Sequence, residues 1–383
     1  MTIRDGQAKS SEPGNNNRVK KVKPIRKEKW SIKRIFKEND FSYIDEIAKN
    51  QRKSQKGANG YKVSALFSSL LFMYLVGIES ILDLVKYLEN HPEWVRFLKL
   101  ERTVNGKKVY KVPDRTTYYK LPQRLNIESS TEILIQMVIQ LMECGIITGE
   151  SISVDATLIS AHYLEKKDKY GKPNKSRDRD AAWTYDSYRK IYVYGYKIHI
   201  LLDVKTALPI GIIVTNAKYG ENRTISSFVE LLKSRYPMIN VENLYGDAGY
   251  DGNKTRLTII EMLNATPYIS LNPRNCKGNS IEEKMARCKK LREKFYKKNF
   301  IHNFWVDPDS LVYKEHHAKR TFSEQTFSIS KGTLKLDNFH HRGLAWATLH
   351  LVFVCVSMIA VAKTAVAVGR PDLLRCIKCF NGI

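Results

Sequence analysis

Two aspartates and one glutamate, far apart along the chain, are the residues best suited to chemistry. Asp155 and Asp247 each follow a short apolar run, and Glu324 lies within the polar stretch 320–331. The apolar runs are predicted strands and the polar stretch is a predicted helix. A short Asp side chain suits a rigid strand end, whereas a longer Glu can reach in from a helix. We therefore expect the three carboxylates to meet at one point.

Clustered carboxylates indicate a site for a hard divalent cation. Mg²⁺ prefers oxygen ligands and typically takes a few carboxylates while keeping waters and substrate phosphates. A pair of such ions can activate a water or a 3′-hydroxyl and stabilise the leaving oxygen of a phosphodiester. The formal net charge of +25, from 64 basic and 39 acidic residues, implies a polyanionic partner. DNA or RNA is the first candidate, and an anionic membrane surface is the second.

Basic residues surround Glu324 at helical spacing. Arg320 lies four positions before it and Lys331 seven after it. On a continuous helix these residues share one face, and His317 extends the same stripe. Such a face would hold a DNA phosphate beside a metal-bound carboxylate. An exposed helix with an ordinary Arg–Glu ion pair is the alternative, and it is favoured when this stretch is considered alone.

A second candidate for DNA contact is the stretch 113–120. Asp114 can cap a helix there, and the next turn exposes basic, hydroxyl and aromatic groups that include Arg115 and Lys120. These features are typical of a recognition helix in a helix-turn-helix unit. An ordinary surface helix is an equal alternative, and Pro122 would shorten or kink it.

The elements that must position these residues change character near residue 150. Residues 31–147 show helical periodicity. The following order of strand, hairpin, helix, strand, helix, strand and further helices predicts a mixed sheet with helices packed against it. Charged insertions are expected near 162–190 and 272–312, with Asp178 and Asp180 solvated in the first. Residues 1–30 are expected to form a disordered basic arm along phosphates, and 369–383 a C-terminal tail.

Cysteine usage and hydropathy favour a soluble, cytoplasmic protein. The six cysteines are scattered, so we expect reduced thiols, and no metal at the single CxxC of Cys376 and Cys379. No signal peptide is visible. The apolar stretch 344–362 has nearly the length of a membrane span. Because it contains polar residues such as His350, we expect a buried core helix rather than a membrane anchor. Neither a serine-hydrolase motif nor a Walker loop occurs.

Several motifs resemble those of the DDE transposases encoded by bacterial insertion sequences. The pattern Arg-x3-Glu-x6-Lys at Arg320, Glu324 and Lys331 resembles their C-terminal signature, in which a Tyr stands where this chain has His317. Four further segments are similar to the regions of the family that carry the first aspartate, the second aspartate, the hairpin and the N-terminal domain: 154–157, 246–250, 194–209 and 61–125. The resemblance covers most of the chain after the basic arm.

This resemblance implies an α/β (α+β) fold, with a ribonuclease-H-like mixed sheet flanked by helices over 148–368. An all-helical DNA-binding domain would precede it over 31–147. The resemblance also implies two Mg²⁺ ions, replaceable by Mn²⁺, bound by Asp155, Asp247 and Glu324. Arg320 and Lys331 would contact DNA phosphates near the cut, and His317 would stand in for a Tyr that helps to hold a distorted DNA end.

The implied function is that of a DNA transposase. It would cleave the ends of an insertion sequence at terminal inverted repeats and join them to target DNA by Mg²⁺-dependent hydrolysis and transesterification. Its partners would be double-stranded DNA and a second copy of the chain in a synaptic complex, at the bacterial nucleoid and without a membrane. Two alternatives stay open. One is a catalytically inactive DNA-binding regulator, and the other is a ribonuclease-H-like nuclease without strand transfer.

Overall fold

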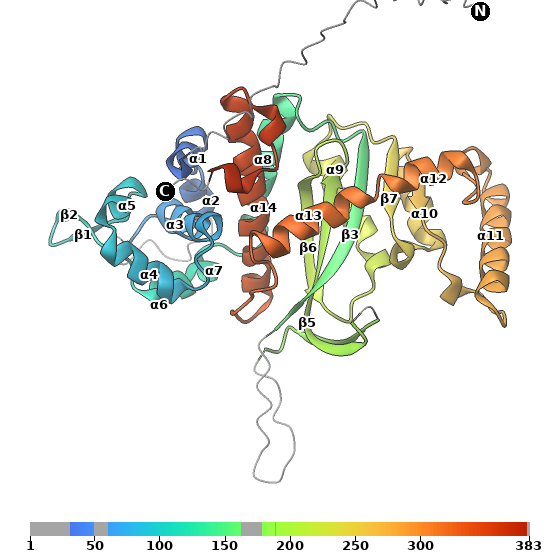
Figure 1. Cartoon of the computed structure of the whole chain (residues 1–383), viewed down its shortest axis with the longest axis horizontal. Helices are drawn as coiled ribbons and strands as arrows, with labels where there is room; N and C mark the ends of the chain where they lie inside the picture. The colour runs from blue at the N-terminus through green and yellow to red at the C-terminus, as the bar shows by residue number, and fades with distance from the viewer. Residues whose placement is uncertain (1–30, 50–59, 162–177, 188, 381–383) are drawn as a thin grey trace, which may run out of the picture.

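The computed structural model describes residues 31–49, 60–161, 178–187 and 189–380. The predicted basic arm, most of the first insertion and the last three residues of the tail lie outside these ranges. Helices make up most of the N-terminal part, as predicted (Figure 1). They are α1 (Ile32–Glu38), α2 (Ile44–Lys49), α3 (Val63–Val76), α4 (Ile81–Asn90), α5 (Pro92–Phe97), α6 (Arg115–Tyr119), α7 (Leu121–Arg124) and α8 (Ile127–Glu143).

A two-stranded ribbon interrupts this helical part. Strands β1 (Glu101–Val104) and β2 (Lys107–Tyr110) pair antiparallel and project from the molecule (Figure 1). Asn105 and Gly106 connect them, with φ angles of 49° and 76°. Two successive positive φ angles in an Asn-Gly pair are typical of a tight hairpin turn. The prediction of an all-helical segment therefore missed a hairpin that this dipeptide signals.

A mixed sheet forms the second half of the fold. Its order is β4–β5–β3–β7–β8, with β6 also paired to β5. The β4, β5, β3 and β6 pairings are antiparallel, whereas β7 runs parallel to both β3 and β8. This sheet and its flanking helices confirm the predicted fold class. The strands are β3 (Ser151–Ser160), β4 (Ala182–Asp186), β5 (Ile191–Asp203), β6 (Leu208–Asn216), β7 (Asn243–Gly246) and β8 (Thr266–Ile269).

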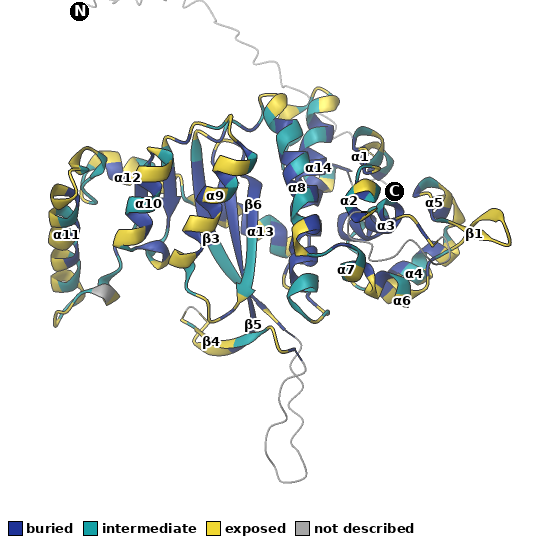
Figure 2. Cartoon of the chain, turned by 180° about the vertical axis from the view of Figure 1, so that it is seen from behind, coloured by how far each residue is buried: buried dark blue, intermediate teal, exposed yellow. Residues whose placement is uncertain are grey.

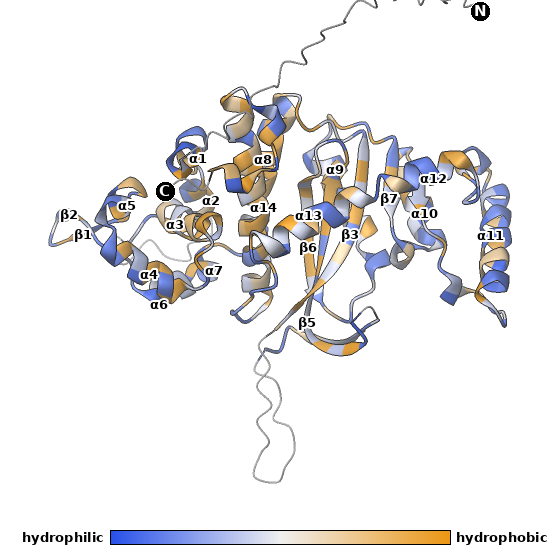
Figure 3. Ribbon diagram, in the orientation of Figure 1, coloured by the Kyte–Doolittle hydropathy of each residue, from blue (hydrophilic) through white to orange (hydrophobic). Residues whose placement is uncertain are grey.

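Helix α14 joins the two halves. It packs against α1, α3 and α8 on one side and against β6 on the other, and Figure 2 shows its dark, buried surface. Its residues are apolar on nearly every side (Figure 3), as expected of a helix surrounded by protein. The remaining helices are α9 (Ile225–Arg235), α10 (Asn253–Leu263), α11 (Ile281–Lys298), α12 (Leu311–Ala318), α13 (Thr321–Gly332) and α14 itself (Leu344–Ala367).

The burial of α14 confirms that the apolar stretch 344–362 is a core helix. By length and composition alone α14 could cross a membrane, but 83% of its apolar window is buried inside the protein. One hydrophobic cluster runs from Ile32 in α1 to Phe380 near the end of the described chain. The two halves thus share a core, and the division into domains at residue 147 stays a prediction.

Two acidic residues of the first insertion, Asp178 and Asp180, accept hydrogen bonds from the backbone at the start of α14. Asp178 is buried, and its carboxylate accepts hydrogen bonds from the Tyr196 hydroxyl (2.6 Å) and the Gly343 backbone N–H (3.1 Å). Asp180 is exposed and accepts one from the Leu344 N–H (2.9 Å). The prediction that Asp178 is solvated was wrong, because the first N–H groups of a helix need acceptors and Gly343 has no side chain to offer one.

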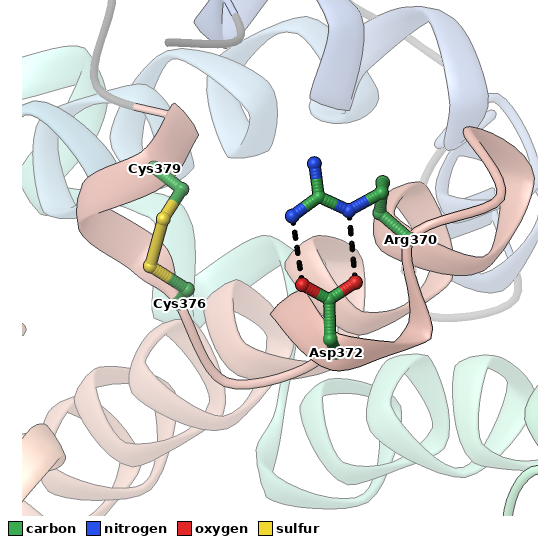
Figure 4. The surroundings of a disulfide bond; sticks show 4 residues. All are labelled: Arg370, Asp372, Cys376 and Cys379. Atoms are coloured by element: carbon green, nitrogen blue, oxygen red, sulfur yellow. Dashed lines mark hydrogen bonds and ion pairs between the residues drawn. A yellow bond between two sulfur atoms is a disulfide. The ribbon is translucent and has the colours of Figure 1, made fainter. Parts of the chain in front are cut away.

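The C-terminal segment contains a disulfide between Cys376 and Cys379, with Cα atoms 5.4 Å apart (Figure 4). Beside it, the Arg370 guanidinium makes two hydrogen bonds to the Asp372 carboxylate. The expectation of reduced thiols was therefore wrong for this pair. It holds for Cys144, Cys276, Cys288 and Cys355, which are free.

Candidate active site

Asp155 and Asp247 lie at adjoining positions of two parallel strands. In the β3–β7 pairing, Val154 is opposite Gly246, and each aspartate is the next residue along the chain, Asp155 within β3 and Asp247 just after β7. Because β3 continues beyond Asp155 whereas β7 ends at Gly246, Asp247 is free to begin the short 3-10 turn η2 (Ala248–Tyr250). The sheet register thus explains why residues 92 positions apart in the sequence come together.

Hydrogen bonds fix both carboxylates. Asp155 is 9% exposed, and its Oδ1 accepts from the Ala156 N–H (2.8 Å) while its Oδ2 accepts from the Ser323 hydroxyl (2.7 Å). Asp247 Oδ1 accepts from the Gly249 N–H (2.8 Å), which caps η2. Ser323 belongs to α13, so this helix contacts the acidic pair directly.

The electrostatics of the pair show crowded negative charge. Burial raises the pKa of Asp155, although the hydrogen bond from Ser323 opposes the rise. The pKa of Asp247 is raised to about 6 by burial first and then by the negative charges of Glu221 and Asp155. The positive charge of Arg320 lowers the pKa of both aspartates. A cation between these carboxylates would relieve the repulsion.

Glu221 is a carboxylate of this region that the sequence did not reveal. It begins the 3-10 turn η1 (Glu221–Arg223), which packs against η2. Its Oε1 lies 3.0 Å from the Lys197 ammonium of β5. No spacing rule relates Glu221 to either aspartate, because the contact depends on how two loops meet.

Tyr250, the last residue of η2, lies in the same electrostatic surroundings. Its ring is fully buried, and its hydroxyl has no hydrogen-bond partner among the described residues. Burial and the negative charges of Glu221, Asp155 and Asp247 raise the pKa of this hydroxyl. Buried polar atoms are normally hydrogen-bonded, so an unpaired hydroxyl close to carboxylates is exceptional.

In this structure the Glu324 carboxylate is paired with Arg320 and does not join the carboxylates of the two aspartates. Its side chain is 58% exposed, and its Oε1 lies 3.0 Å from the Arg320 guanidinium. The neighbouring Ser323 occupies the position of α13 that faces Asp155. One residue along a helix is a turn of about 100°, so Glu324 points to the side of that contact. The expected meeting of three carboxylates is thus seen for the aspartates only.

The sequence from 148 to 359 matches the family described as the transposase DDE domain, and this match spans more than half of the chain. The chain belongs to the DDE transposase family. Among solved structures, a cryo-EM structure of the piggyBac transposase synaptic complex with hairpin DNA is similar at 11% sequence identity, with a TM-score of 0.38. The similarity covers 91% of this chain and 78% of that chain. No curated protein sequence matches the chain.

The family signature is divided between two helices. His317 lies in α12, Arg320 precedes the first turn of α13, and Glu324 and Lys331 lie within α13. The expectation that His317 extends one continuous helical stripe was wrong. Its ring stacks on Tyr313 with centroids 5.5 Å apart, and its Nε2 lies 2.8 Å from the Ser270 hydroxyl.

The other residues predicted to contact DNA are exposed or weakly paired. Lys331 lies 3.6 Å from Asp337 in a partly exposed ion pair. Arg115 and Lys120 are exposed at the two ends of α6, which lies far from the sheet (Figure 1). This helix has five residues and is followed directly by α7, which contains Pro122. It is shorter than a typical recognition helix, as Pro122 suggested.

The residues present fit a divalent cation in part. DDE transposases generally use divalent metal ions. Asp155 and Asp247 offer oxygen donors, and Mg²⁺ is commonly held by one or two carboxylates with waters and substrate phosphates. In the described part of the chain, however, no three His, Cys, Asp or Glu side chains are placed to hold an ion together. Two aspartates are thus in place, and a third carboxylate would have to turn toward them.

Proposed function

We propose that this chain is a DNA transposase of the insertion-sequence type. It cleaves the ends of its element at terminal inverted repeats and joins them to target DNA by hydrolysis and transesterification. The observation that carries the proposal is the pair of neighbouring aspartates, Asp155 within β3 and Asp247 just after β7, within the segment that matches the family. Their crowded negative charge suits a divalent cation, and a cation bound there would in turn attract the phosphate backbone that the carboxylates alone would repel.

Asp155, Asp247 and Glu324 are the proposed catalytic and metal-binding residues. When bound, Mg²⁺ or Mn²⁺ would activate the attacking oxygen and stabilise the leaving oxygen of the phosphodiester. Asp155 is oriented for this role by Ser323, and Asp247 by the Gly249 N–H. Glu324 must leave Arg320 to take part.

DNA binding would break the ion pair between Arg320 and Glu324. Arg320 pairs with Glu324 through one guanidinium nitrogen, and a phosphate is an alternative partner that guanidinium binds through two. Arg320 would thus exchange a carboxylate for a DNA phosphate, which releases Glu324 beside the acidic pair. Lys331 would likewise exchange its ion pair with Asp337 for a contact with a DNA phosphate. His317, held by Ser270, would contact the DNA end.

The proposed partners are double-stranded DNA and a second copy of the chain, in the bacterial cytoplasm at the nucleoid. Arg115 and Lys120 of α6 would contact DNA phosphates away from the cut. Because the two ends of an element are cut together, a dimer in a synaptic complex is the expected active form.

Cleavage of a duplex that carries the inverted repeats flanking the gene tests this proposal. We expect Mg²⁺-dependent nicking at the repeat end, followed by joining to a target plasmid. Asp247→Asn should lower the rate at least about 100-fold, because the substitution removes a charge needed in the transition state. Asp83→Asn is the matched control, since Asp83 is an exposed residue of α4 that pairs with Ser80. It should cleave at the wild-type rate.

Each other outcome has a distinct meaning. Cutting without joining would indicate a nuclease, and binding without cutting would indicate a DNA-binding regulator. Equal cleavage by Asp247→Asn and the wild type would contradict the proposed site.

A further inference from the structure

Glu221 lies closer to Asp247 than its sequence position suggests. An ideal Cβ placed on Gly249 would lie 1.8 Å from Glu221 Oε2 and 3.0 Å from Asp247 Oδ1. These two carboxylate oxygens are therefore less than about 5 Å apart. The glycine is what permits this approach, because any side chain at position 249 would displace the Glu221 carboxylate.

The backbone around Glu221 is held in place. Its carbonyl accepts hydrogen bonds from the Thr224 hydroxyl (2.7 Å) and the Thr224 N–H (3.0 Å). Its Oε1 is paired with the Lys197 ammonium at 3.0 Å, and the two side chains are only 22% and 15% exposed. One carboxylate oxygen is thus held by a lysine, while the other faces Gly249 and Asp247.

The buried hydroxyl of Tyr250 is an independent sign that a ligand belongs here. It lacks a hydrogen-bond partner among the described residues, although the ring is fully buried. Glu221 is its strongest electrostatic neighbour, followed by Asp155 and Asp247. Buried hydroxyls are nearly always hydrogen-bonded, so one left unpaired beside three carboxylates points to a ligand that binds between them.

We propose that Glu221 is a further carboxylate of the divalent-cation site formed by Asp155 and Asp247, with Lys197 as the counter-ion that holds it when no cation is bound. This inference rests on the proposed function only in taking the two aspartates as cation ligands. All donors are oxygens, which suits Mg²⁺ or Mn²⁺. Glu221 would complete the site by turning its carboxylate from Lys197 toward the two aspartates.

Mn²⁺ binding to the full chain without DNA tests the proposal, measured by electron paramagnetic resonance of the free ion. We expect Glu221→Gln to weaken binding at least about tenfold, as removal of residues in a metal's surroundings commonly does. Glu230→Gln is the matched control, because Glu230 is exposed on α9 and the change in charge is the same. It should bind Mn²⁺ as the wild type does. Thermal melting of each variant shows that it is folded.

A substitution of Lys197 tests the same proposal, with the opposite expected effect on Mn²⁺ affinity. Lys197→Met frees Glu221 from its ion pair, so Mn²⁺ should bind more tightly than in the wild type. In the Glu221→Gln background the same substitution should have little effect, because its action passes through Glu221. Equal tightening in both backgrounds would show a general effect of charge and overturn the assignment.

The failure of this inference can be distinguished from failure of the proposed function. If Asp247→Asn loses Mn²⁺ binding while Glu221→Gln keeps it, Glu221 is not part of the site and the proposed function stands. If the wild type and Asp247→Asn bind Mn²⁺ equally, the aspartates do not form the cation site, and both proposals are wrong.

Discussion

The negative charge of Asp247 destabilises the folded protein when no cation is bound. Its pKa is raised to about 6 by burial and by the neighbouring charges of Glu221 and Asp155, whereas the unfolded value is near 3.8. Between these two pH values the folded chain binds more protons than the unfolded chain. The stability contribution of the protonated form is thus present at low pH and is lost as the pH rises through 6.

Replacing Asp247 with Asn should therefore stabilise the cation-free protein at pH 7.5. Each pKa unit corresponds to about 1.4 kcal/mol, so we expect a gain of about 1–3 kcal/mol in the free energy of unfolding. The difference from the wild type should shrink toward pH 4, and Mn²⁺ should stabilise the wild type only. Urea denaturation at the two pH values measures this. A variant that is less stable than the wild type at pH 7.5 would contradict the expected electrostatics.

At the level of secondary structure, α14 depends on acceptors supplied from outside its own sequence. Gly343 precedes it and has no side chain, so Asp178 and Asp180 take over the role of a helix cap. Negative charge at a helix N-terminus is also favoured by the helix dipole. Because α14 contacts both halves of the protein, this cap supports the common core and, through it, the strands that carry the aspartates.

Asp178→Ala should destabilise the fold by about 2–4 kcal/mol, because it leaves the buried Tyr196 hydroxyl and the Gly343 N–H without their acceptor. Asp180→Ala is the matched comparison. It removes one exposed cap contact and should cost about 1 kcal/mol. Urea denaturation of the two variants measures the difference. Equal losses of stability, or a loss below about 0.5 kcal/mol for Asp178→Ala, would contradict the prediction that the buried carboxylate of Asp178 stabilises the fold more than the exposed one of Asp180.

At the scale of the whole molecule, three histidines (His199, His341 and His350) are held in the neutral form, and His350 also joins separate parts of the chain. His350 of α14 lies between the Tyr74 hydroxyl of α3 (2.5 Å) and the Leu336 carbonyl (2.8 Å). Burial lowers the pKa of His350 and of His341 to about 4, and that of His199 to about 3. The folded chain thus binds fewer protons than the unfolded chain from these values up to the ordinary value of 6.5.

Stability should therefore fall as the pH drops below 6.5. Each neutral ring should contribute a loss of about 2 kcal/mol by pH 5, offset in part by the gain at Asp247. Chemical denaturation at pH 7 and pH 5 measures the total change. His350→Asn should reduce the pH dependence, whereas His302→Gln, at an exposed position, should leave it as in the wild type. Stability that does not change between pH 7 and pH 5 would contradict this account.

Much of the fold was predictable because periodicity reports which face of an element is buried. The strand before Asp247, the β5–β6 hairpin and the core helix α14 followed from apolar patterns, and the family match followed from motifs at the same positions. The strand at Asp155 was also predicted, but Asp155 lies within β3 rather than at its end, where it was expected. The β1–β2 hairpin was missed although its Asn-Gly turn is a strong local signal. That error came from extending the helical pattern across a short segment.

The details of the site depend on contacts that sequence spacing does not contain. Glu221 approaches Asp247 because two loops pack together at Gly249, and nothing near position 221 indicates this. His317 left the predicted stripe because the chain begins a new helix after Arg320. Asp178 is buried because it accepts a hydrogen bond from the N–H of Gly343, the N-cap of α14, which has no side chain of its own to cap the helix. Gly343 is far from Asp178 in the sequence, so no local pattern indicates this contact.

Anomalous X-ray scattering from crystals of the chain soaked in Mn²⁺ tests the central claim most directly. The central claim is that Asp155 and Asp247 together bind a divalent cation. It predicts an anomalous peak about 2 Å from a carboxylate oxygen of each aspartate. Manganese bound elsewhere, or beside only one of the two aspartates, would contradict it.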